Sequence, residues 1–387
     1  MSVSSTAALF TRDAIAQFAG DVFASMPRVD QRRWAEVYVR GLLLVEGKKS
    51  VRRISEDILV QPAHQSLQQF INQSPWEWEP VRARLVQYIE SLSSPQAWVL
   101  GRTVIPKRGQ RSVGVERRFL PEAGRVVNCQ IGSSVSLATQ GGNIPVNWRL
   151  LLPERWLADP ALTQSAYIPD GIVAHPEWRE LLAMLIEMQF RWGAAPVPVI
   201  GDLRYLEDAG RLIRALADRG MDFALEVNGS LEILDGMPVR DASAGRSGRC
   251  AFDRAATALE HFRVLCARRL RSPAAPDRHH PKVVSSTVRL PAGNPASDRV
   301  RLLSELSSRG VPTRFWVTSL TEQSIADVMN RIRLQHGSQA DLRVLEEDFG
   351  LRDFEGRSFR GWHHHMTMVS AAYTFNRIGV EPAIRSA

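Results

Sequence analysis

Apolar side chains recur every three or four positions between about residues 21 and 91, which is the spacing of one buried helix face. Trp34 and Tyr38 show the pattern clearly. The polar turn Asn-Gln-Ser-Pro at residues 72–75 separates two of the predicted helices. The pattern therefore predicts a helical N-terminal domain over residues 1–95.

At Trp98 the helical spacing gives way to short apolar runs, which are typical of buried strands. The predicted strands lie near residues 98–100, 112–115, 128–137, 147–152 and 196–202, and the predicted helices cover residues 176–190 and 206–219. Antiparallel strands followed by a helix, a central strand and a further helix indicate a mixed α/β domain. We assign its first part to residues 96–226.

Residues 227–320 are less regular, with short apolar runs separated by segments rich in proline, glycine and serine. They are predicted to form a β-rich insertion. Helical spacing returns in residues 321–387, which we assign to the C-terminal helices of the α/β domain. Gly337 and Ser338 lie inside this region, and a glycine within a helix costs about 1 kcal/mol. We therefore expect the helix to break or kink there.

Lysine and arginine outnumber the acidic residues 49 to 41, which gives a net charge of +8 and a pI near 9.9. Such a surplus favours a polyanionic partner, and nucleic acid is the commonest one. The basic residues gather in two stretches, and either stretch could contact phosphates or form a solvated face. The candidate DNA-binding residues are Lys107, Arg108, Arg111, Arg117, Arg118, Arg268 and Arg269.

The three cysteines form no C-x-x-C pair, so neither a disulfide framework nor a structural zinc site is expected. The apolar runs are too short for a membrane span, and the N-terminus lacks the pattern of a signal peptide. The sequence thus favours a cytoplasmic protein without a membrane partner. His363, His364 and His365 are consecutive, and successive helix residues point about 100° apart. They are therefore predicted to have a structural or surface role rather than to bind one metal ion.

Four stretches are distinctive when they are taken together. They read RRWAEVYVRGLLLVEGKKSV (32–51), LQQFINQSPWEWEPVR (67–82), PKRGQRSVGV with NCQIGSSVSLAT (106–115 and 128–139), and FEGRSFRGWHHHMTMVSAAYTF (354–375). In order and spacing they resemble the bacterial DDE-type insertion-sequence transposases, of the insertion sequence 701 branch. The resemblance implies an RNase H-like catalytic domain with a β-rich insertion before its last helix, preceded by a helical domain that could bind DNA ends.

The resemblance also implies where catalytic carboxylates belong. Such enzymes hold two divalent cations about 4 Å apart, and magnesium-like ions prefer carboxylate oxygens. The family has Asp-Asp-Thr on its first strand, but this chain has Gly101, Arg102 and Thr103. The Asp before the threonine is the usual ligand, so Arg102 stands at a ligand position. The second acid is retained as Asp202.

The third family acid belongs on the late helix, in an Arg-Trp-x-Ile-Glu pattern. Counting back from the well-matched stretch FGLRDFEGR places Gln339 at this position, and the later basic residue becomes Glu346. Asp341, Glu346 and Glu355 are the possible substitute acids, although Glu355 belongs to an intact family motif. We expect the Arg102 guanidinium to pair with Asp202 in place of a metal. Alternatively, Arg102 points into solvent, and backbone amides or another arginine, such as Arg204, hold Asp202.

These observations favour a transposase-family DNA-binding protein whose nuclease site is degraded, acting as a regulator or as a binder of element ends. Two alternatives stay open. One is an active transposase that cuts and joins DNA with Mg²⁺ and substitute acids. The other is a recruited role in which the old cleft holds a small molecule or a partner protein. No cofactor is expected unless the nuclease site is active, and the protein could form a homodimer.

Overall fold

The computed structural model describes residues 12–120, 123–235, 254–291 without 271–282, and 298–378. The chain divides into two compact units. The first comprises residues 1–195 and 336–387, and the second comprises residues 196–335. The four domains drawn from the sequence differ from this division, and their bounds stay a prediction.

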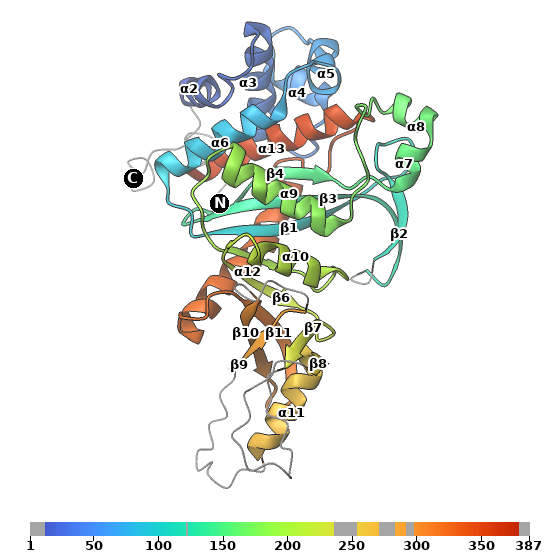
Figure 1. The fold of residues 1–387 in the computed structure, drawn as a ribbon. Coiled ribbons are helices and arrows are strands. Elements are labelled where there is room, and N and C mark those ends of the chain that lie inside the picture. The colour runs from blue at the N-terminus through green and yellow to red at the C-terminus, as the bar shows by residue number, and fades with distance from the viewer. Residues whose placement is uncertain (1–11, 121–122, 236–253, 271–282, 292–297, 379–387) are drawn as a thin grey trace, which may run out of the picture. The chain divides into compact units, whose positions relative to one another are not determined.

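From residue 12, where the described part of the first unit starts, the chain forms five helices, as the periodicity predicts, although the first of them starts before residue 21. They are α2 (Arg12–Val22), α3 (Val29–Leu44), α4 (Val51–Ile58), α5 (His64–Asn72) and α6 (Trp78–Leu92). The helix α13 (Phe359–Ile378) packs against α3, α5 and α6 and also against strand β4 (Figure 1). Nearly all of α13 is buried, so it forms the core around which these N-terminal helices assemble.

The sheet of this unit is antiparallel. Its strands are β1 (Ala97–Pro106), β2 (Glu116–Leu120), β3 (Arg125–Thr139) and β4 (Gly142–Leu150), and β3 pairs with each of the other three. The short helices α7 (Glu154–Ala158) and α8 (Pro160–Ser165) follow, and then α9 (Glu177–Ile186) continues into a π-helical turn, η1 (Glu187–Arg191). Adjacent residues of β3 contact different helices. Gly132 lies against Trp362 of α13, and Ser133 bonds to Glu177 of α9, so the two helices cover opposite faces.

The predicted strand at residues 112–115 is wrong. This segment forms a turn, in which Gly114 has a positive φ of 72° and lies against the side chain of Leu150. Val113 and Val115 are fully buried on either side of it. Both valines are buried because the loop folds back on the unit. Their spacing of two residues is the same as that of apolar residues in a half-buried strand, so the sequence pattern could not distinguish the two.

The second unit contains a mixed sheet in the order β5-β6-β11-β10-β9-β7-β8 (Figure 1). Strands β5 (Val199–Asp202) and β6 (Phe223–Val227) are parallel and are joined by α10 (Ala209–Ala217). The other strands are antiparallel to their neighbours: β7 (Glu232–Asp235), β8 (Arg254–Thr257), β9 (Val283–Arg289), β10 (Arg299–Leu306) and β11 (Pro312–Thr318). Helix α11 (Ala258–Leu270) follows β8. The mixed α/β class predicted from the sequence is confirmed.

Helix α12 runs without interruption from Ile325 to Glu347, so the predicted break at Gly337 and Ser338 is wrong. A Cβ atom on Gly337 would lie 3.0 Å from the Nδ2 atom of Asn143. The glycine therefore permits a close approach to β4, and this packing outweighs its low helix propensity.

The three consecutive histidines are all buried in α13, and each has its own surroundings. His363 stacks on Trp78 and lies beside the Arg82 guanidinium. His364 stacks on Trp76 and faces the carbonyl oxygens of Ile71 and Trp76. They point to different partners, as the helical geometry predicts. Their role in this structure is to bind the N-terminal helices to α13.

His365 is neutral in the folded state. Its Nε2 atom lies 3.0 Å from the carbonyl oxygen of Gly350, and its Nδ1 atom lies 3.0 Å from the Tyr38 hydroxyl. The neutral ring satisfies both contacts if Nε2–H donates and Nδ1 accepts. Burial lowers the pKa of His365 to about 4, and it lowers the pKa of His364 to about 3.

Acid should therefore destabilise the protein well above the pH at which ordinary carboxylates titrate. A histidine pKa that is depressed by folding stabilises the native state above pH 6.5, and this stability is lost as the pH falls toward 4. Each such histidine contributes about 1.4 kcal/mol per pH unit. We expect His365→Gln to lower stability at pH 7 but to flatten the pH dependence between pH 6 and 4.5 in urea unfolding. The exposed His336→Gln is the matched control. An unchanged slope in His365→Gln would contradict the assignment.

Candidate functional site

Gly101 and Arg102, which the resemblance places at acid positions of the family, lie in the middle of β1 opposite Ser134 and Ser133 of β3. A Cβ atom on Gly101 would lie 2.6 Å from the Ser134 hydroxyl oxygen, so a larger residue there requires a local shift. Ser134 therefore leaves little room for a side chain at position 101.

The Arg102 side chain lies beside the carboxylate of Glu177. Its Nε atom lies 3.7 Å from Glu177 Oε2, and the Ser133 hydroxyl donates to Glu177 Oε1 at 2.9 Å. The Arg102 and Glu177 side chains are only 18% and 11% exposed. Arg102 therefore serves as a largely buried counter-charge to Glu177, on the sheet face that α9 covers.

Two of the proposed substitute acids, Glu346 and Asp341, belong to the late helix. Glu346 Oε1 lies 2.7 Å from Arg352 and 3.5 Å from the Thr103 hydroxyl. Because side chains alternate along a strand, Thr103 and Glu346 lie on the opposite face from Arg102. Burial raises the pKa of Glu346, and Arg352 partly offsets that effect.

Asp341 is buried and tied to protein groups. Its carboxylate accepts hydrogen bonds from the backbone amide of Asn143 (2.8 Å), from the Tyr373 hydroxyl (2.6 Å) and from Arg377 (2.7 Å). It therefore acts as a clamp between α12, β4 and α13. Glu355 forms an ion pair with Lys48 at the surface, and Gln339 is exposed on α12.

Asp202, which the resemblance gives as the retained second acid, ends β5. Arg204 donates to it three times: from Nε to Oδ1 at 2.9 Å, from Nη2 to Oδ2 at 2.6 Å, and from the backbone amide to Oδ1 at 3.0 Å. Burial raises the pKa of Asp202, but these bonds more than offset it and hold the pKa below its ordinary value. Arg204 and a backbone amide thus hold Asp202, which is one part of the alternative expected from the sequence. Its other part, Arg102 in solvent, is wrong, because the Arg102 side chain is only 18% exposed beside Glu177. The Arg102–Asp202 pair stays a prediction.

Sequence reasoning missed a second acid in this place, Glu226. It lies on β6 in register with Asp202, and its side chain is fully buried. Arg314 of β11 donates to both of its oxygens, at 2.9 and 2.7 Å, and Gln335 donates at 3.2 Å. The Nε atom of Arg204 lies 3.3 Å from Glu226. The one available signal was a charged residue inside the apolar run Phe-Ala-Leu-Glu-Val.

The four charges at the ends of β5 and β6 therefore cancel. Asp202 and Glu226 supply two negative charges, and Arg204 and Arg314 supply two positive charges. A divalent cation needs carboxylate oxygens that are free to coordinate it. Within the described residues, no group of three or more His, Cys, Asp or Glu side chains is arranged to hold a metal ion. These acids, as they are paired, do not fit a two-metal centre.

The candidate DNA-binding residues of the first unit differ in exposure. Arg108, Arg111 and Arg117 are exposed. Lys107 instead donates to the carbonyl oxygen of Phe354 at 2.7 Å, and burial lowers its pKa. Arg118 pairs with Glu116 on the same strand. The side chains of Arg268 and Arg269 lie outside the described residues.

The model of a family described as DDE superfamily endonuclease matches residues 21–281. Comparison with curated proteins finds no match. In the described part of the chain, every helix is too short or too polar to cross a membrane.

We expect the ion pairs around Glu226 to contribute to the stability of the protein. Arg314→Met should lower the free energy of unfolding by about 3 kcal/mol, because it removes the bidentate partner of a fully buried carboxylate. Adding Glu226→Gln should restore much of the loss, since the unpaired charge is then gone. A double-mutant cycle in urea measures the coupling. Arg211→Met, at an exposed arginine of the same unit, should change stability little. If Arg314→Met behaves like this control, Glu226 does not depend on Arg314.

Proposed function

Because the chain belongs to the DDE superfamily of endonucleases, we propose that it is a DNA-binding protein of transposase descent whose nuclease site is degraded. Four sequence stretches support a finer placement, in the insertion sequence 701 branch with an RNase H-like core. The acids at the ends of β5 and β6 support the proposal that the nuclease site is degraded, because arginines neutralise both of them.

The loss of cleavage follows from the chemistry of two-metal sites. The family mechanism needs carboxylates that hold two cations against the attacking and leaving oxygens. An arginine cannot coordinate a cation, and it stays protonated at every accessible pH. Arg102 stands at the first acid position, Gln339 stands at the third, and Asp202 is held by Arg204.

The alternative of an active enzyme requires a substitute acid that is free to bind metal. Asp341 holds α12 against β4 and α13, Glu346 pairs with Arg352, and Glu355 pairs with Lys48. Each would have to give up a protein partner first. These contacts favour the degraded site over the active one.

DNA binding is proposed to use the exposed arginines around β2. Arg108, Arg111 and Arg117 extend into solvent, and the net charge of the chain is +8. Phosphate contacts of this kind carry no sequence information, but they supply much of the affinity and make it salt-dependent. The role would then be regulation of, or binding to, the ends of a parent element.

We expect affinity for duplex DNA to fall steeply with salt, and the triple variant Arg108→Gln/Arg111→Gln/Arg117→Gln to flatten that dependence. Each lost phosphate contact lowers the slope of log K against log salt by about 0.9. Fluorescence anisotropy at several salt concentrations measures it. The matched control replaces three exposed arginines of the second unit: Arg219, Arg309 and Arg333. Equal slopes for the two triple variants would contradict the proposed surface.

Purified protein should neither nick nor join element-end DNA with Mg²⁺ or Mn²⁺. A supercoiled plasmid nicking assay and a strand-transfer assay test this directly. The proposal fails if cleavage is robust and is lost in Asp202→Ala. Cleavage that survives Asp202→Ala but is lost in Glu346→Gln would also overturn it, and would identify a substitute acid.

A further inference from the structure

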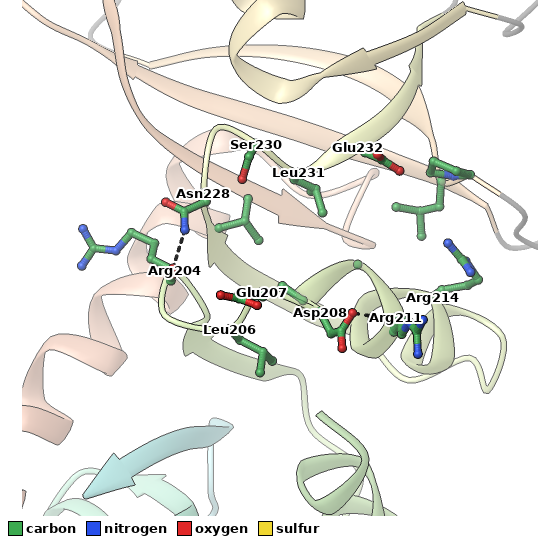
Figure 2. A pocket seen from close by; sticks show the side chains of 15 residues that line it. Arg204, Leu206, Glu207, Asp208, Arg211, Arg214, Asn228, Ser230, Leu231 and Glu232 are labelled. Atoms are coloured by element: carbon green, nitrogen blue, oxygen red, sulfur yellow. Dashed lines mark hydrogen bonds and ion pairs between the residues drawn. The ribbon is translucent and has the colours of Figure 1, made fainter. Parts of the chain in front are cut away.

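A cavity of about 440 Å³ lies within the second unit, beside the carboxyl ends of β5 and β6. The loop after β5, the first turns of α10 and the segment after β6 line it (Figure 2). Its volume falls within the range of roughly 300–1,000 Å³ that small-molecule sites occupy. The carboxyl ends of parallel strands, next to the start of the connecting helix, are where open α/β sheets bind ligands.

Two arginines of α10 make one side of this cavity cationic. Arg211 and Arg214 are three residues apart, so they lie on the same helix face. Arg211 has a loose partner in Asp208, with Nε 3.5 Å from the carboxylate. The Nε atom of Arg214 is shielded from solvent and has no hydrogen-bond partner among the described residues. Arg214 lines the cavity, and a planar guanidinium fits a phosphate group well.

The start of α10 adds to this preference. Asp208 and Gly210 line the cavity, and the Asp208 side chain makes no capping hydrogen bond to the helix amides. A helix N-terminus carries a partial positive charge that favours an anion. The Arg204 side chain points away from the other residues in Figure 2, toward Asp202, and only its carbonyl oxygen meets Asn228. Because Arg204 is already paired with Asp202, we do not count it as a phosphate ligand.

The rest of the lining suits the other parts of a nucleotide. Leu231 and Leu290 offer apolar surface to a base, and Ser230 offers a hydroxyl for its polar edge. Glu207 and Glu232 are acceptors that match sugar hydroxyls. Together with Asp208, these carboxylates disfavour a polyphosphate, because repulsion grows with each added negative charge.

We propose that this cavity binds one nucleoside monophosphate unit, with its phosphate on Arg211 and Arg214. The unit is either a free mononucleotide or the 5′-phosphorylated end of a DNA strand, since both present the same chemistry. The inference goes beyond the DNA-binding surface near β2 and does not depend on it.

The test is isothermal titration of the full chain with AMP, dAMP, ribose 5-phosphate and inorganic phosphate. Single-stranded hexathymidylate is titrated with and without a 5′-phosphate. Arg214→Gln should weaken nucleotide binding roughly tenfold or more, because it removes charge-assisted hydrogen bonds. Arg219→Gln is the matched control, at an exposed arginine of the same chain segment that does not line the cavity. Thermal unfolding of each variant confirms that it is folded.

Binding of AMP or dAMP that Arg214→Gln alone weakens supports a free nucleotide. Stronger binding of the 5′-phosphorylated strand, with the same response to Arg214→Gln, supports a strand end. The proposal is overturned if no nucleotide binds at millimolar concentration, if inorganic phosphate or ribose 5-phosphate binds as well as AMP, or if both variants weaken binding equally. Arg214→Gln should leave the salt dependence of duplex binding unchanged, so this result is separable from failure of the DNA-binding proposal.

Discussion

A carboxylate that is removed from water needs a positive charge close by, and this constraint explains the site as the structure has it. In an enzyme of this superfamily, divalent cations would meet the need at the strand ends. In this chain, arginine side chains meet it. Arg314 and Arg204 neutralise Glu226, and Arg204 also holds Asp202. In the first unit, Arg102 faces Glu177.

Guanidinium groups and metal ions solve the same electrostatic problem with different consequences. A metal ion leaves coordination positions open for substrate oxygens, and so it can activate a nucleophile. A guanidinium directs fixed hydrogen bonds at its own carboxylate and offers no such position. Under the proposal of a degraded nuclease site, arginines hold the acids at the strand ends without the metal chemistry of the superfamily. A scaffold held this way can still present cations to DNA.

Sequence reasoning performed best where a feature is local. Helix periodicity predicted the N-terminal helices, and the apolar run at Trp98 predicted β1, because both patterns depend on near neighbours in the chain. It failed at Gly337, where close packing against Asn143 overrides helix propensity. It missed Glu226 because its partner Arg314 is 88 residues away, a pairing that no spacing rule reveals. Lys107 illustrates the same limit, since a basic residue in a basic run turned inward to Phe354.

The arginines of this chain differ in whether an acid of the protein already holds them. Arg102, Arg204 and Arg314 lie beside acids of the protein, so they contribute to stability and have little left for a ligand. Arg108, Arg111 and Arg117 are exposed near one edge of the first unit, which suits a long polyanion. Arg214 is half-buried in a cavity, which suits one compact phosphate. Net charge alone cannot separate these three uses, and only the burial and partners of each guanidinium do so.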